Sequence, residues 1–181
     1  MKKQFWIEAL KGGTVIGLVS VALALVTQYT ENATIVGVLN FLSTVVTIML
    51  AFGYTRKFAA GHSKQEGFSY GRGVGFVVAM MLFVGVISGV YSAVMANFFI
   101  KEELLEVVNT TMAQMQDMIP TESFDSTYSL MRNSVTNPLM LTISSVFSNA
   151  FFGLLVGLCA SALTRRQPDI FAEDGNNAPQ E

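Results

Sequence analysis

Charged residues are scarce in this chain. They make up 13% of its 181 residues, whereas an ordinary soluble domain has about 25%. They are missing altogether from four long apolar stretches, 12–29, 33–54, 74–100 and 138–163. Such stretches are typical of a protein whose solvent is a lipid bilayer. The net charge of −2 is too small to indicate a nucleic-acid partner.

The chain has one cysteine and one histidine, which limits its chemistry. Cys159 alone forms no intramolecular disulfide, and its apolar neighbours predict a small buried side chain rather than a reactive thiol. His62 lies in a polar loop, and no serine of the apolar stretches has a candidate base. The stretches hold no ionisable residue for a proton relay. We therefore expect no catalytic residues, no enzymatic activity and no cofactor.

The four stretches predict membrane-spanning helices. A hydrocarbon core about 30 Å thick needs about 20 apolar residues in a helix, and lipid offers backbone groups no outside partner. We predict an all-α fold, a polytopic transmembrane bundle of four helices, in a single domain over residues 1–166. Only residues 30–32 join the first two spans. The polar tail 167–181 is expected to be disordered.

Basic residues predict the orientation of the spans. Nine of the eleven lie in the N-terminal segment, the loop 56–72 and the residues just after the fourth span. The opposite side has only Lys101 and Arg132, together with most of the acidic residues. This asymmetry places both termini in the cytoplasm of a multi-pass protein.

The segment 101–137 is the longest connection between spans. Apolar residues recur there at helical spacing, first up to Pro120 and then from Phe124 onwards. We predict an extracytoplasmic amphipathic helical hairpin between the third and fourth spans, with Asn137 and Pro138 opening the fourth. Its apolar stripes would pair with each other or with a partner. The predicted interaction surface is Leu104, Val108, Met112, Met115, Phe124, Tyr128 and Met131.

Three methionines of this segment, Met112, Met115 and Met118, follow a three-residue spacing. Thioethers are soft ligands that suit Cu(I), so these residues are a weak candidate for a metal site. The chain has 10 methionines, and an apolar helix stripe explains the same spacing. We expect no metal site here.

Small residues at four-residue spacing predict close packing of the spans. Gly85 and Gly89 mark the third span, and Asn149, Gly153 and Gly157 mark the fourth. The amide side chains in the spans, Asn40, Asn97 and Asn149, allow two interpretations. They either line a polar path or form hydrogen bonds between helices, and we favour the second.

Several of these features resemble a known family, the DUF4199 proteins. The similarity rests on residues 67–73 before the third span, the acidic, methionine-rich helix that follows, 136–138, 148–155 and 164–166. It covers about residues 3–166. The polar loop 61–66 differs from the more charged stretch of its relatives. The resemblance implies a small four-span protein of the bacterial inner membrane, mainly in Bacteroidota and thus a Gram-negative host, and it supplies no catalytic residues.

Two functional hypotheses follow. The first is a non-enzymatic interaction or assembly protein that uses the outer hairpin, either as a homo-oligomer or with another membrane or periplasmic protein. The alternative is a component of a small-solute transporter or channel, built on the amide side chains of the spans. Neither hypothesis involves nucleic acid, and the lipid bilayer is a partner in both.

Overall fold

The computed structural model describes residues 2–62, 67–116 and 120–167. All regular elements in these ranges are helical. In chain order they are α1 (Lys2–Gln28), α2 (Ala33–Ala60), α3 (Tyr70–Val94), the π-helical segment η1 (Met95–Phe99), α4 (Lys101–Met115), α5 (Thr121–Thr136) and α6 (Pro138–Thr164). The predicted disordered tail lies outside the described residues, apart from Gln167.

In the described part of the chain, four helices are long and apolar enough to cross a membrane: α1, α2, α3 continued by η1, and α6. This confirms the prediction of an all-helical fold with four candidate spans. Two helices extend past the predicted spans, since α1 begins at Lys2 rather than at residue 12 and α2 ends at Ala60 rather than at 54. Charged residues mark the limit of an apolar stretch, but they are good helix formers and do not end a helix.

Two asparagines fix where helices begin. The Asn32 side chain accepts hydrogen bonds from the N–H groups of Thr34 and Ile35, at 3.0 and 3.3 Å, and caps α2. Asn137 caps α6 in the same way, with Pro138 in its first turn. Because such caps satisfy helix N–H groups that have no partner in their own helix, they set the start sharply. The predicted start of the fourth span is confirmed.

Among the described helices, the antiparallel pair of α3 and α6 has the most extensive contact. Along this contact the glycines of one helix lie against residues of the other: Gly73 on Ser161, Gly85 on Val146, Gly89 on Thr142, Gly153 on Met81 and Gly157 on Val77. A β-carbon at Gly85 or Gly89 would lie 2.7 Å from a Cα atom of α6. The two backbones approach this closely because glycine has no side chain.

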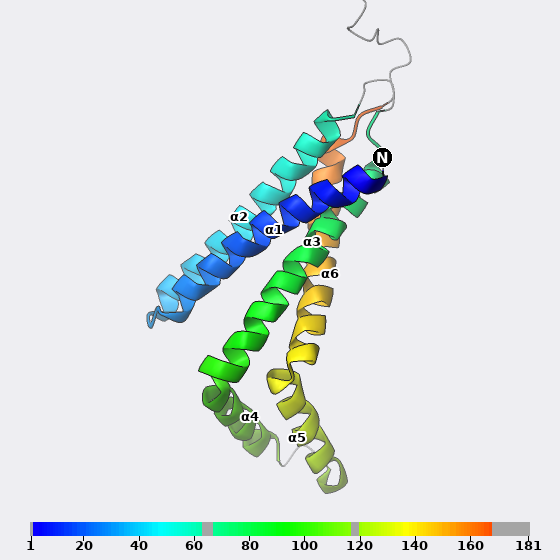
Figure 1. Cartoon of the computed structure of the whole chain (residues 1–181). Helices are drawn as coiled ribbons and strands as arrows, with labels where there is room; N and C mark the ends of the chain where they lie inside the picture. Colours follow the sequence, from blue (N-terminus) through cyan, green and yellow to red (C-terminus); the bar gives the residue numbers. More distant parts are fainter. Residues whose placement is uncertain (1, 63–66, 117–119, 168–181) are drawn as a thin grey trace, which may run out of the picture.

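The other two long helices form the α1–α2 hairpin, in which α1 packs against α3. Gly13 and Gly17 of α1 lie against Met80 and Ile87 of α3. Toward the α1–α2 turn, the hairpin diverges from α3 and α6 (Figure 1). The buried apolar core therefore lies near the N-terminal end of the molecule, around fully buried Phe76.

The α2–α3 loop and the end of α6 join at the same end of the molecule. Phe68 and Arg166 form an isolated antiparallel bridge with two backbone hydrogen bonds, of 3.0 and 3.1 Å. Gly67 has a φ of 62°, which is the left-handed region where glycine carries no steric penalty. The Tyr70 hydroxyl donates to the carbonyl of Leu158 at 3.1 Å. The bridge thus fixes the chain where it enters α3.

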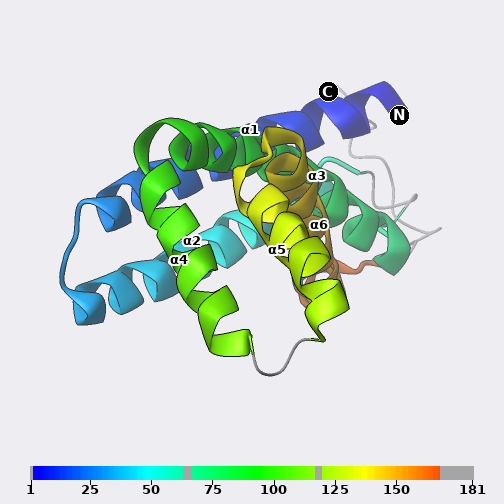
Figure 2. The ribbon, with the colours of Figure 1, turned by 90° about the horizontal axis from the view of Figure 1, so that it is seen from below.

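The helices α4 and α5 lie side by side beyond the far ends of α3 and α6 (Figure 2). A single residue, Asn137, separates α5 from α6. Predicted helices in this segment are confirmed, although α4 ends at Met115, before the proline that was expected to end it. Residues 117–119 lie outside the described ranges.

Candidate functional site

The predicted interaction surface lies on α4 and α5. Val108 and Met112 are 3% and 2% exposed, while Leu104, Phe124, Tyr128 and Met131 are half-buried. Met115 is on the outside, and Met118 lies outside the described residues. The two helices contact each other, which favours the first of the two alternatives left open by the sequence, the pairing of the stripes.

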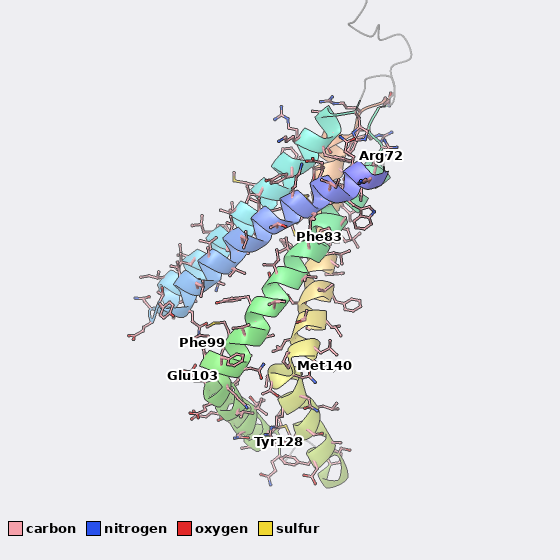
Figure 3. The ribbon with its side chains drawn as sticks, viewed as in Figure 1. Arg72, Phe83, Phe99, Glu103, Tyr128 and Met140 are labelled. Atoms are coloured by element: carbon pink, nitrogen blue, oxygen red, sulfur yellow. The ribbon has the colours of Figure 1, made fainter. Side chains whose placement is uncertain are left out.

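A polar contact joins the two helices. The Tyr128 hydroxyl donates to Oδ1 of Asn109 at 2.8 Å. Tyr128 lies at the end of the molecule farthest from Arg72 (Figure 3). Among the described residues, the hairpin is therefore held by buried Val108 and Met112 and by this hydrogen bond between side chains.

The outer surface of this hairpin combines acidic and apolar side chains. Glu102, Glu103 and Glu106 are exposed on α4, and the first two lie in its first turn, where the helix dipole favours negative charge. Val107 and Leu130 are 62% and 66% exposed. The packing of α4 against α5 leaves both of these apolar side chains on the outer surface of the hairpin.

The segment η1 adds exposed aromatic surface at the base of the hairpin. Its defining bond runs from the N–H of Ile100 to the carbonyl of Met95 at 3.0 Å. Phe98 and Phe99 are 80% and 67% exposed. Single π-helical turns inside α-helices widen the helix locally and often occur at functional sites.

The three asparagines of the spans are not brought together. Asn97 donates to the carbonyl of Ala93, and Asn149 donates to the carbonyl of Ser145, both at 2.9 Å and within their own helices. Asn40 is exposed on α2. The prediction of hydrogen bonds between helices was wrong for Asn97 and Asn149, because each amide satisfies a carbonyl one turn earlier in its own helix.

Cys159 is exposed on α6, so the prediction of a buried side chain was wrong. Apolar neighbours in sequence do not reveal which face of an apolar helix packs inward. Cys159 lines a shallow apolar groove between α2 and α6. Within the described ranges, no group of three or more His, Cys, Asp and Glu side chains is placed to hold a metal ion.

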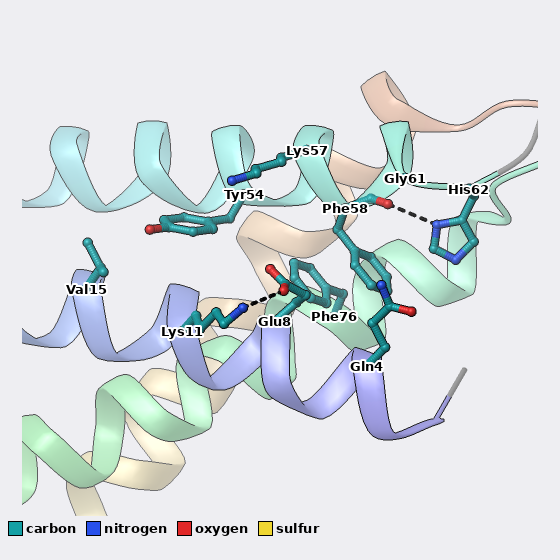
Figure 4. Close-up of a pocket in the computed structure, with 10 residues that line it drawn as sticks. All are labelled: Gln4, Glu8, Lys11, Val15, Tyr54, Lys57, Phe58, Gly61, His62 and Phe76. Atoms are coloured by element: carbon teal, nitrogen blue, oxygen red, sulfur yellow. Dashed lines mark hydrogen bonds and ion pairs between the residues drawn. The ribbon is translucent and has the colours of Figure 1, made fainter.

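The structure contains a cavity that the sequence did not predict. It has a volume of about 630 Å³, lies between α1 and α2 near the N-terminus, and is lined mainly by Gln4, Glu8, Lys11, Val15, Tyr54, Lys57 and His62. Lys11 and Glu8 form an ion pair of 2.9 Å (Figure 4). The first four residues recur every three or four positions and thus share one face of α1. That periodicity becomes visible only when the helix is known to begin at Lys2.

Aromatic side chains form one wall of this cavity. Phe58 of α2 and Phe76 of α3 are stacked, with ring centroids 4.2 Å apart. Phe5 meets both rings edge to face. His62 shares a hydrogen bond of 2.9 Å with the carbonyl of Phe58 through Nδ1. These contacts link three helices around the cavity.

Residues 11–166 match a family described as a protein of unknown function, DUF4199. The chain belongs to the DUF4199 family. The match covers most of the chain and confirms the predicted resemblance. No curated protein and no solved structure matches this DUF4199 chain. Two stretches that carried the resemblance, 67–73 and 164–166, meet at the bridge between Phe68 and Arg166.

Proposed function

We propose that this DUF4199 protein is a non-enzymatic interaction protein of the bacterial inner membrane, with both termini in the cytoplasm and the α4–α5 hairpin outside. The observation that carries the proposal is the division of the hairpin into two surfaces. Val108 and Met112 of its predicted stripe are buried, while Val107 of α4 and Leu130 of α5 remain exposed and three glutamates are exposed on α4. A folded segment that keeps apolar side chains outside is suited to binding another protein.

The charge of the outer surface favours a basic partner. Glu102, Glu103 and Glu106 occupy the first two turns of α4, and Lys101 and Arg132 are the basic residues of the described part of the hairpin. Electrostatic complementarity would steer a partner with a positive patch toward α4, and the exposed apolar side chains would stabilise the complex. The partner is a membrane or periplasmic protein, or a second copy that offers a basic surface.

The first experiment compares charge variants of the hairpin. The triple variant Glu102→Gln, Glu103→Gln, Glu106→Gln should lose the partner, whereas the matched variant Lys101→Gln, Arg132→Gln should keep it. Proteins cross-linked in native membranes would be extracted, separated by size and quantified by mass spectrometry. Equal recovery of the same complex from both variants and the wild type, or a monomer from all three, would overturn the proposal.

A second experiment tests the orientation. Because Cys159 is exposed, the variants start from Cys159→Ser. A cysteine introduced at Leu130 should react with a membrane-impermeant maleimide in intact spheroplasts. A cysteine at Gln167 should react only after the membrane is opened. The reverse pattern would place the hairpin in the cytoplasm.

Among the described residues, no contact supports the transporter hypothesis. Asn97 and Asn149 are bound to their own helices, and Asn40 lies on an exposed face. A polar path through the spans would need these groups to converge. We therefore keep the interaction role as the proposed function.

A further inference from the structure

The cavity between α1 and α2 has a polar end and an apolar end. Gln4 and His62 lie at one end of the cavity, and Val15 lies at the other. Tyr54 projects from α2 on the side of Val15 (Figure 4). The charged side chains of Glu8, Lys11 and Lys57 line the stretch between them. The lining of the cavity therefore becomes less polar toward Val15, which is also the direction in which α1 becomes apolar.

The charges of the cavity favour an anionic group. Glu8 is paired with Lys11 of its own helix. Lys57 reaches the cavity from the opposite helix, and among the described residues no carboxylate forms an ion pair with it. Two lysines thus face one glutamate, and the ammonium group of Lys57 is available to a ligand. A compact ammonium group is well suited to bind a phosphate as a point charge.

The walls of the cavity suit a ligand that is partly apolar. The stacked rings of Phe58 and Phe76 form a rigid wall, because Phe5 packs against both. The apolar end opens beside Val15, which is 40% exposed, and the surface of α1 continues with Leu18 at 59%. An apolar chain that leaves the cavity would follow this surface. The volume of about 630 Å³ lies within the range of about 300–1,000 Å³ that small-molecule sites occupy.

We propose that this cavity binds an anionic phospholipid, with the phosphate held by Lys57 and Lys11 and the first part of an acyl chain beside Tyr54 and Val15. Such a site is placed where it would meet lipid headgroups, because α1 and α2 carry charged residues only near this end. Basic pockets between membrane helices are a known means of holding anionic headgroups. The site is independent of the hairpin, since it lies at the other end of the molecule (Figures 1 and 3).

The test uses the full chain in a neutral detergent, titrated with dioleoylphosphatidylglycerol and followed by native mass spectrometry. Lys57→Gln should weaken binding about fivefold, as expected for the loss of one direct ion pair with the phosphate. Arg56→Gln is the matched control, because Arg56 is exposed on α2 and does not line the cavity. It should leave the affinity unchanged. Equal affinities for wild type and Lys57→Gln would overturn the proposal.

A second pair of variants tests the apolar end. Val15→Trp should block the place of the acyl chain and weaken lipid binding at least tenfold, whereas Leu10→Trp, at an exposed position of α1 that does not line the cavity, should not. Inorganic phosphate is the probe that tests whether the site recognises the anion without an acyl chain. If phosphate competes with the lipid at equal concentration, or if both tryptophan variants bind like the wild type, the site does not recognise a phospholipid.

Discussion

Phe68 and Arg166 exchange two backbone hydrogen bonds, with N···O distances of 3.0 and 3.1 Å. This short bridge joins the beginning of α3 to the end of α6, next to the long contact between the same two helices. Phe68 is 1% exposed, and its ring meets those of Phe58 and His62. The bridge therefore connects the α3–α6 pair to the aromatic wall of the cavity.

Replacing the glycine before this bridge should destabilise the protein. Gly67 has a φ of 62°, and an L-residue in that conformation costs about 1–2 kcal/mol. We expect Gly67→Ala to lower the free energy of unfolding in detergent by that amount. Gly71→Ala is the control, since an added β-carbon there meets nothing within 4 Å, and its stability should be equal or slightly higher. Equal stabilities of both variants would contradict the role of Gly67.

The contact between α3 and α6 should not tolerate a larger residue at Gly85. A β-carbon there would lie 2.7 Å from the Cα atom of Val146, so the backbones would have to separate. We expect Gly85→Ala to cost about 1–3 kcal/mol, measured by reversible unfolding in mixed micelles. Gly75 of the same helix has open space around it. If Gly75→Ala proved as damaging, helix separation would not be the cause.

A buried hydroxyl offers a gain in stability. Ser161 is fully buried, and its Oγ has no hydrogen-bond partner among the described residues. An unpaired buried hydroxyl costs about 1–3 kcal/mol, so Ser161→Ala should raise the free energy of unfolding. Thr164 lies one turn later and donates to the carbonyl of Ala160 at 2.9 Å. Thr164→Val should lower the free energy of unfolding, and the same sign for both variants would count against this account.

The α4–α5 hairpin should open locally when its hydrogen bond is removed. Tyr128→Phe deletes the bond to Asn109, which is worth about 0.5–1 kcal/mol at a partly exposed site. Amide hydrogen exchange in α4 and α5 should become about two- to fivefold faster, with no change in α3 or α6. Tyr29→Phe, at an 82% exposed position, is the control and should leave the hairpin unaltered.

Some features could be predicted from local sequence alone. The long apolar stretches determine four helices, because backbone groups in an apolar solvent must be satisfied within their own segment. The pair Asn137–Pro138 determines where α6 begins, since both residues act on the nearest turn of the chain. The periodic stripes of α4 and α5 likewise follow from spacing. These are interactions within a few residues, so the order of residues is enough to specify them.

The tertiary structure decided which faces meet. Helical spacing alone did not distinguish Val108, which is buried, from the other members of its stripe. The sequence around Cys159 likewise did not indicate that this side chain is exposed. The cavity brings together Glu8 of α1 and Lys57 of α2, from two antiparallel helices. Such pairings depend on the rotation and crossing of helices, which result from close approach at glycines such as Gly85 and not from the composition of either helix.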